Sequence, residues 1–287
     1  MSNTSTTSPP ASANTSSALA ERAARRYVLA ATILGSSMVF IDGTVVNVAL
    51  PALQSAFHAT AIDVQWVIES YALFLAALLL VGGSLGDHFG RRRVYSAGVT
   101  IFTLASICCG LAAGVTQLII ARAVQGIGGA LLVPGSLAII STSFPKEERG
   151  QAIGVWSGFS AITAAIGPVM GGWLIEHVSW RAVFFINVPL AIAVLALTYC
   201  FVPESRDAGS VGELDWLGAL LATVSLGALV YGLIESSRSG LANAVVLGAF
   251  VVGVSLRYSS LSPSRDTKIR CCLSRSFVRW IFLARIS

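Results

Sequence analysis

Charge is what this sequence has least of. Only 11% of its 287 residues are Asp, Glu, Lys or Arg, and the mean hydropathy is +0.76, whereas a soluble domain carries about 25% charged residues. A chain with so few charges cannot cover its apolar side chains with a polar surface in water. The composition therefore argues against an ordinary soluble domain and indicates a protein that buries apolar surface in lipid.

Histidine and patterned cysteine are scarce too. The three histidines are scattered along the chain, and the five cysteines form no CxxC pair, so we predict no metal site, no disulfide framework and no catalytic Ser/His/Asp cluster. The net charge is +5, but no basic patch with interleaved aromatic residues accompanies it, which argues against nucleic-acid binding. We expect neither an enzyme nor a cofactor.

What the sequence does have is a series of long apolar runs. A membrane-spanning helix needs about 20 residues, and in lipid a spanning segment must satisfy its own backbone hydrogen bonds. We therefore predict an all-α integral membrane protein with about eight spans. Their expected bounds are Tyr27–Leu50, Trp66–Gly86, Val94–Val115, Leu118–Ser141, Ala152–Ile175, Val183–Val202, Trp216–Ile234 and a short Ala242–Leu256.

The two ends of the chain differ from these runs. Residues 1–26 begin with an uncharged Ser/Thr/Asn/Pro/Ala-rich stretch, which predicts a disordered tail without the basic start and apolar core of a signal peptide. Residues 257–287 hold seven of the nineteen basic residues. We interpret this tail as a non-native reading frame, from a frameshift or truncation. The alternative is a genuine basic cytoplasmic segment that binds anionic lipid headgroups.

Basic residues predict the orientation in the membrane. Nine of them fall in connections on one side of the predicted spans and only two on the other, and basic loops face the cytoplasm. The nine are Arg22, Arg25, Arg26, Arg91, Arg92, Arg93, Lys146, Arg149 and Arg206, against Arg181 and Arg238. We therefore expect both termini to be cytoplasmic.

The stretch "GGSLGDHFGRRR", Gly82–Arg93, concentrates charge after a nearly uncharged run. Its arginines can anchor the cytoplasmic end of the second span, but that does not explain the acid or the glycines. Asp87 follows the end of a helix, where the helix dipole disfavours a negative charge. We expect it to meet a positive partner, either a nearby arginine or the start of another helix.

Two ionisable residues lie well inside the spans. Asp42 is in the first span, and burial favours the neutral form of a carboxyl group, so it can take up and release protons. Arg122 is the only basic residue within a span, and a carboxylate is its natural partner. For each residue a purely structural role is the alternative. Asn47, Glu69 and Gln125 are candidate substrate contacts, although Asn47 could instead join helices and Glu69 could be solvated.

Small residues mark two spans as close-packed. Gly126 follows Arg122 by one helical turn, and "GPVMGG" contains Gly167, Pro168, Gly171 and Gly172. Proline removes a helix hydrogen bond and permits a kink, and glycines four residues apart allow helices to approach closely. We expect contact faces at Gly167/Gly171 and at Gly154/Gly158.

Four motifs in this order resemble signatures of the major facilitator superfamily, in the drug:proton antiporter branch with fourteen helices. They are "IDGTVVNVALP", "GSLGDHFGRRR", "LIIARAVQGIGGA" and "GPVMGG". In the second, the matching positions are Gly83, Leu85, Asp87, Gly90, Arg91 and Arg92. "SWRAVFFINVP", Ser179–Pro189, also resembles the start of the sixth helix in this branch.

The resemblance implies both an architecture and a function. It implies a six-helix amino-terminal half at 27–202, a cytoplasmic linker at 203–215 and two extra helices at 216–256. It also implies proton-coupled efflux of drugs or other small lipophilic molecules by alternating access. Asp42 and Arg122 would couple protons to transport, and the loop around Asp87 and Arg91 would act as a gating latch.

The family's second half has no counterpart in this sequence, so we expect a truncated form that does not transport. The alternatives are a transporter of another small solute and an inert or scaffold-like membrane fragment. The expected partners are the lipid bilayer, protons and a drug-like molecule, and the expected location is a bacterial inner membrane.

Overall fold

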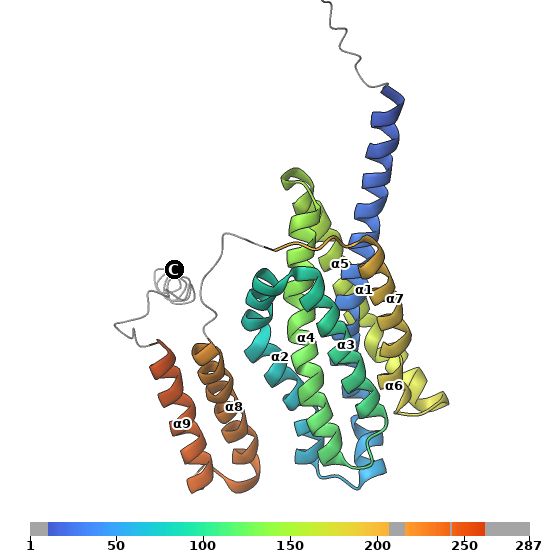
Figure 1. Cartoon of the computed structure of the whole chain (residues 1–287). Helices are drawn as coiled ribbons and strands as arrows, with labels where there is room; N and C mark the ends of the chain where they lie inside the picture. Colours follow the sequence, from blue (N-terminus) through green and yellow to red (C-terminus); the bar gives the residue numbers. More distant parts are fainter. Residues whose placement is uncertain (1–10, 207–215, 242, 262–287) are drawn as a thin grey trace, which may run out of the picture.

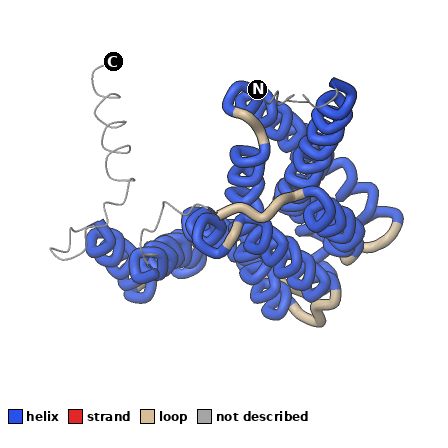
Figure 2. The backbone as a smooth tube through the Cα atoms, turned by 45° about the horizontal axis from the view of Figure 1, so that its top comes forward, coloured by secondary structure: helices blue, strands red, loops and turns tan. Residues whose placement is uncertain are grey.

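The computed structural model describes residues 11–206, 216–241 and 243–261, and the described part is helical without a strand (Figure 2). This confirms the all-α prediction. The helices are α1 Ala11–Phe57, α2 Ala61–Phe89, α3 Arg91–Gly110, α4 Val115–Ser143, α5 Lys146–His177, α6 Ala182–Phe185, α7 Asn187–Phe201, α8 Trp216–Ser239 and α9 Ala244–Leu261 (Figure 1).

Six stretches of the described helices are long and apolar enough to cross a membrane, and they match the first six predicted spans. The sixth is Ala182–Phe201, formed by α6 and α7 together. The last two predicted spans are helical as well, but their apolar stretches are shorter, at Val224–Ser236 and Ala244–Leu256. Residue 242, where the eighth predicted span begins, lies outside the described residues.

Helices α1 to α7 form one bundle, and α8 and α9 form a hairpin beside α2 (Figure 1). In the bundle α4 packs on both α2 and α3. Glycines make these contacts close: a Cβ on Gly82 would lie 2.1 Å from the carbonyl oxygen of Ala130, and one on Gly128 would lie 2.5 Å from the backbone nitrogen of Phe102. The hairpin contacts the bundle where Trp66 of α2 meets Tyr231 of α8, with 6.0 Å between ring centroids.

Helix α5 packs against α1 through one of its two predicted glycine faces. A Cβ on Gly167 would lie 2.0 Å from Oγ1 of Thr44, and one on Gly171 would lie 2.3 Å from Cγ2 of Val45, so α5 approaches α1 closely along this face. The second face is wrong for the described residues, because a Cβ on Gly154 or Gly158 would meet nothing within 4 Å. A small-residue spacing predicts that a close approach is allowed, but it does not determine which partner arrives.

The ends of the chain depart from the sequence prediction where they are described. Helix α1 begins at Ala11, inside the segment predicted to be a disordered tail. The stretch "ALAERAARR", 18–26, is made largely of strong helix formers, and a helix extends readily once it has been nucleated by its packed part. At the other end α9 runs to Leu261. Residues 1–10, 207–215 and 262–287 lie outside the described residues, and so do the predictions made for them.

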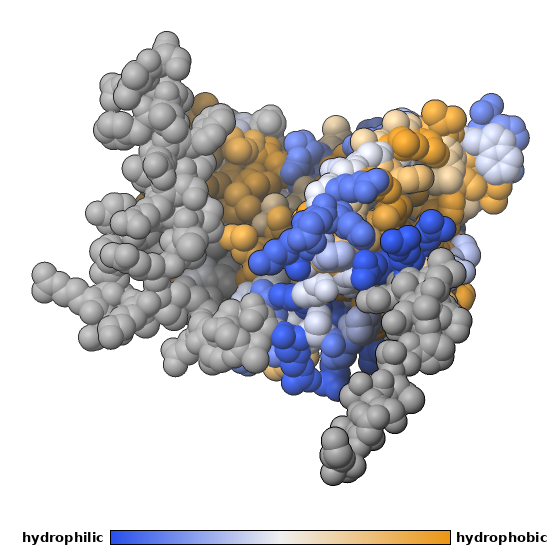
Figure 3. Space-filling model, turned by 90° about the horizontal axis from the view of Figure 1, so that it is seen from above, coloured by the Kyte–Doolittle hydropathy of each residue, from blue (hydrophilic) through white to orange (hydrophobic). Residues whose placement is uncertain are grey.

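One end of the bundle carries the predicted cytoplasmic charges. The turn between α2 and α3, the end of α7 and the loop between α4 and α5 all lie at this end (Figure 1). Arg25 of α1 forms an ion pair there with Glu148 of α5, at 3.4 Å. Viewed from this end, hydrophilic side chains gather over the helix ends (Figure 3).

Candidate functional site

Asp42 of α1 and Arg122 of α4 form an ion pair in the interior of the bundle. Their side chains are 0% and 1% exposed, and Nη1 of Arg122 donates to Oδ2 of Asp42. The carboxylate partner expected for Arg122 is therefore Asp42. Nε of Arg122 also donates to the carbonyl oxygen of Val67, at 3.2 Å, so the guanidinium joins α1, α2 and α4.

Gln125 completes the pair from the next turn of α4. Its Nε2 donates to Oδ1 of Asp42, and its Oε1 accepts from Nη1 of Arg122, both at 2.8 Å. The thiol of Cys109 in α3 also donates to Oε1, at 3.6 Å. Gln125 was a candidate substrate contact, but here its side chain is fully buried and both ends of its amide serve the ion pair.

Asn187, at the first position of α7, is the third side chain that contacts Asp42. Its Nδ2 lies 3.3 Å from Oδ1 of Asp42 and donates to the hydroxyl oxygen of Ser106 at 2.9 Å. Ser106 in turn donates to the carbonyl oxygen of Phe184, at 2.8 Å. Sequence reasoning did not single out Asn187. Its signal was an amide at the start of an apolar span, within the motif "SWRAVFFINVP".

Tyr71 of α2 covers Arg122 on a further side. The guanidinium carbon lies 4.1 Å from the centre of the Tyr71 ring, a distance at which a cation is attracted to an aromatic face. The Tyr71 hydroxyl donates to the carbonyl oxygen of Val39, at 3.2 Å. The backbone of Tyr71 is also close to α4, because a Cβ on Gly126 would lie 2.5 Å from its carbonyl oxygen.

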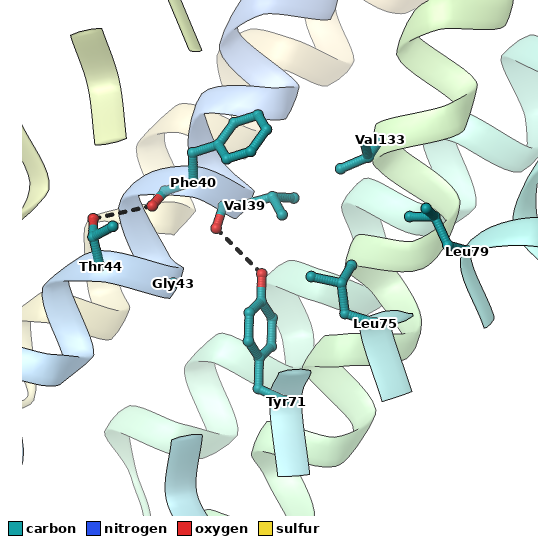
Figure 4. Close-up of a pocket in the computed structure, with 8 residues that line it drawn as sticks. All are labelled: Val39, Phe40, Gly43, Thr44, Tyr71, Leu75, Leu79 and Val133. Carbon is teal, nitrogen blue, oxygen red and sulfur yellow. Dashed lines mark hydrogen bonds between the residues drawn. The ribbon is translucent and has the colours of Figure 1, made fainter. Parts of the chain in front are cut away.

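Tyr71 also lines an apolar pocket of about 320 Å³ between α1, α2 and α4 (Figure 4). One ring therefore touches both the pocket and the guanidinium of the ion pair. The predicted substrate contacts did not include this pocket, because its wall is assembled from three helices. The lining residues are Val39, Phe40, Gly43, Thr44, Tyr71, Leu75, Leu79 and Val133.

A second group of charges lies at the turn between α2 and α3. Oδ1 of Asp87 accepts from Nε and Nη2 of Arg91, at 2.9 and 2.7 Å. The positive partner expected for Asp87 is thus the nearby arginine. Between them Gly90 has φ = +109°, a region that favours glycine, and this turn lets α3 begin directly after α2.

Glu204, just after α7, holds this turn in place. Its Oε1 accepts from the backbone nitrogen of Arg92 at 3.2 Å, and its Oε2 lies 3.5 Å from Nε of Arg93. The backbone nitrogen of Arg91 donates to the carbonyl oxygen of Ser205, at 3.0 Å. A Cβ on Gly90 would lie 2.6 Å from Oε1 of Glu204. Sequence reasoning missed Glu204, because only the fold brings residues this distant together.

The remaining predicted residues lie outside both charge groups. Asn47 is exposed, and its amide donates to the carbonyl oxygen of Gly43 in its own helix, at 3.0 Å. Glu69 is half-buried on α2. Gly83 and Gly172 have looser surroundings, with a Cβ 3.6 Å from Pro134 and 4.0 Å from Val48, respectively. Within the described ranges, no cluster of His, Cys, Asp or Glu could hold a metal ion.

Comparison with known proteins identifies the family to which the chain belongs. The model of the Major Facilitator Superfamily matches residues 32–263. The multidrug resistance protein Stp of Mycobacterium tuberculosis is 43% identical over 74% of this chain and 40% of its own length. The tetracenomycin C resistance and export protein of Streptomyces glaucescens is 37% identical over 84% of this chain and 45% of its own length. The chain thus spans less than half the length of these relatives.

A solved structure shares the fold. It is a bacterial homolog to the human lysosomal transporter Spinster, in an inward-facing and unoccupied conformation. The TM-score is 0.52 at 24% identity, and the match covers 87% of this chain and 65% of that one. With six helices long and apolar enough to span a membrane, the chain is a multi-pass membrane protein.

Proposed function

Because the chain belongs to the major facilitator superfamily, we propose that it is the amino-terminal portion of a proton-coupled exporter of drugs or other small lipophilic molecules. It comprises a six-helix half at 27–202, a cytoplasmic linker at 203–215 and two further membrane helices at 216–256. Both termini face the cytoplasm, and the membrane is a bacterial inner membrane. The names of the relatives support the drug substrate, and the count of basic residues supports the orientation.

The observation that carries the proposal is the ion pair of Asp42 with Arg122 in the interior of the bundle. Ionisable side chains inside a membrane are costly, and they mark ion and proton pathways in transporters. Protonation of Asp42 removes its charge and with it the attraction to Arg122, so the contact between α1 and α4 weakens. Loss of the proton restores it. The pair is thus a two-state element that a proton gradient can bias.

The pocket at Tyr71 suits the substrate. Small-molecule sites are mostly apolar concavities with a few polar groups, and the lining here has that character. A drug that displaces the Tyr71 ring also changes the cation–π contact with Arg122. Substrate binding and protonation of Asp42 therefore act on the same arginine from two sides.

The remaining predicted residues shape the motion. The cytoplasmic latch consists of Gly83, Asp87, Gly90, Arg91 and Arg92. Glu204 is an added member. Gly126 permits the close approach of α2 to α4, and Gly167 and Gly171 permit that of α5 to α1, with Gly172 following on the same helix. Pro168 allows α5 to bend. We retain Asn47 and Glu69 as candidate substrate contacts on α1 and α2.

Inverted membrane vesicles test the proposal. The chain is expressed alone and together with the part of Stp that lies beyond the match, and proton-driven uptake of a fluorescent lipophilic cation is measured. We expect no uptake by the chain alone. With the part of Stp present, we expect uptake that collapses with a protonophore and is abolished in Asp42→Asn. The matched control is Asp63→Asn, which changes an acid at the start of α2 and should transport normally. Uptake that persists in Asp42→Asn would overturn proton coupling through this residue.

A further inference from the structure

The geometry points to Asn187 as the residue that holds Asp42 in both of its protonation states. It donates a hydrogen bond to the charged carboxylate and, after its amide turns over, accepts one from the neutral carboxyl group. Asn187 is a positioning residue in this scheme, since it gains and loses no proton itself. The inference rests on the proposed proton uptake at Asp42.

A neutral carboxyl group needs an acceptor, and the other partners of Asp42 cannot supply one. The guanidinium of Arg122 has donors only. Gln125 presents its Nε2 to Asp42, and its Oε1 already accepts from Arg122 and Cys109. When Asp42 takes up a proton, neither neighbour can accept it in a hydrogen bond in this arrangement.

Asn187 has the acceptor that is missing elsewhere. Its side chain is fully buried, and its Oδ1 has no hydrogen-bond partner. Buried polar atoms are nearly always paired, and an unpaired one costs free energy comparable to a lost hydrogen bond. An orphaned acceptor on the very amide that contacts Asp42 calls for a state in which it is used, and the protonated state of Asp42 is such a state.

Protonation of Asp42 exchanges a defined set of hydrogen bonds. One proton from the aqueous phase binds a carboxylate oxygen of Asp42, and the new O–H donates to Oδ1 of Asn187. The hydrogen bond from Nδ2 of Asn187 to Asp42 breaks as the amide turns over. Arg122 gives up its bond to Asp42 and keeps those to Gln125 and to the carbonyl of Val67. Deprotonation reverses each change.

Other groups around Asp42 bear on its protonation. Arg122 from α4 is its ion-pair partner. Tyr71 from α2 and Cys109 from α3 contact the two residues of α4 that bind it, Arg122 and Gln125. Helix α5 brings Gly167 against the backbone of Ile41, next to Asp42. Helix α7 brings the uncharged amide of Asn187. Since Arg122 favours the charged carboxylate, the neutral form depends on a compensating partner, and Asn187 is positioned to be that partner.

The position of Asn187 carries the signal to another helix. It stands at the start of α7, which packs along α1, and its Nδ2 also holds Ser106 of α3. An amide that turns over must exchange its bond to Ser106 as well. Protonation of Asp42 on α1 therefore changes hydrogen bonds on α7 and α3, although neither helix contributes a charged residue to the ion pair.

Infrared difference spectroscopy of the full chain in lipid vesicles tests this inference without requiring transport. The band of the protonated Asp42 carboxyl is followed as a function of pH and identified by its absence in Asp42→Asn. In Asn187→Leu the carboxylate loses one donor and the neutral form loses its acceptor, so the decisive signal is the C=O band of the neutral form. This band should move to higher frequency, as it does when a carboxyl group loses a hydrogen bond.

Asn187→Asp separates this role from packing. The new side chain is nearly isosteric and retains an acceptor, and its negative charge favours a shared proton. The hydrogen bond to the neutral carboxyl group is therefore kept, and the band should not move to higher frequency. The matched control is Thr198→Val, which removes another unpartnered buried polar atom from α7 and should leave the band unchanged.

The outcomes separate the two proposals. If no carboxyl band disappears in Asp42→Asn, Asp42 takes up no proton and the proton coupling proposed above fails. If the band is present but Asn187→Leu leaves its frequency unchanged, the role of Asn187 alone is overturned. A parallel shift of the band to higher frequency in Asn187→Leu and Asn187→Asp would also overturn it, because packing changes would then explain both.

Discussion

The two acid–arginine pairs of this molecule look alike and differ in their surroundings. Asp42 and Arg122 are 0% and 1% exposed, while Asp87 and Arg91 are 39% and 14% exposed. In the interior, three further side chains from three helices contact the two charged groups: Gln125, Asn187 and Tyr71. At the turn, water can solvate them. Burial makes the inner pair costly to break, and exposure makes the outer pair adjustable by its neighbours and by salt.

The difference in burial suits the inner and outer ion pairs to different roles. A buried pair gains little net stability over an apolar packing, but breaking it by removing one partner strands a charge. That all-or-none property suits a group whose protonation is to be felt by several helices. The outer pair bridges the turn between α2 and α3, and Glu204 contacts the same turn at the backbone nitrogen of Arg92. Contacts between partly exposed charges can open and close without unfolding the bundle.

Removal of Arg122 should give the largest effect. We expect Arg122→Ala to lower the free energy of unfolding in detergent by about 3–5 kcal/mol near neutral pH, because Asp42 is left charged and buried. At acidic pH the loss should shrink, since Asp42 can take up a proton and become neutral. Thermal unfolding at two pH values measures both. An equal loss at both would show that the effect comes from packing. The stability of Arg122→Lys should lie between that of the unchanged chain and that of Arg122→Ala, because lysine keeps the charge but lacks the planar fork of the guanidinium.

Gly90 ranks next, and it tests the outer pair through the backbone. Gly90→Ala places a side chain at φ = +109° and within 2.6 Å of a Glu204 oxygen. We expect a loss of about 1–3 kcal/mol and release of the segment after α7, seen as faster hydrogen exchange there. The control is Gly158→Ala, where a Cβ meets nothing within 4 Å. Slower exchange in Gly90→Ala would contradict the tether to Glu204.

Sequence reasoning predicted the features that lipid imposes. The six spans and a carboxylate partner for Arg122 follow from the cost of burying backbone and charge. The arginine partner of Asp87 follows from local spacing. Sequence reasoning missed Asn187, Tyr71 and Glu204, because a single polar side chain has no periodic signature and its partner lies on another helix. Among the residues that the structure describes, nothing meets the predicted face at Gly154 and Gly158, since spacing alone does not specify a neighbour.

Tyr71 offers a smaller test on the inner side of the comparison. Tyr71→Leu keeps an apolar side chain in the pocket but removes the aromatic face over Arg122, and we expect a loss of about 0.5–2 kcal/mol. Tyr71→Phe keeps the face and loses only the hydrogen bond to Val39, at a cost of about 1 kcal/mol. Binding of a fluorescent lipophilic cation to the chain in detergent should weaken in Tyr71→Leu more than in Tyr71→Phe. The reverse order would remove the ring from the coupling scheme.

Asp87→Asn should have the smallest effect on stability and is the sharpest contrast to Arg122→Ala. The carboxylate of Asp87 is partly exposed, so loss of its ion pair should cost about 0–1 kcal/mol, and asparagine can still accept a hydrogen bond from Arg91. Whatever stability the pair contributes should fade as salt rises, because exposed charges are screened over about 8 Å at physiological ionic strength. Unfolding of the chain and of Asp87→Asn is compared at low and high salt, with Arg122→Ala measured alongside. We expect the gap between the chain and Asp87→Asn to close with salt while the gap to Arg122→Ala stays open, since no counterion reaches the interior. If both gaps respond to salt alike, the inner pair is hydrated as freely as the outer one, and the buried switch loses its physical basis.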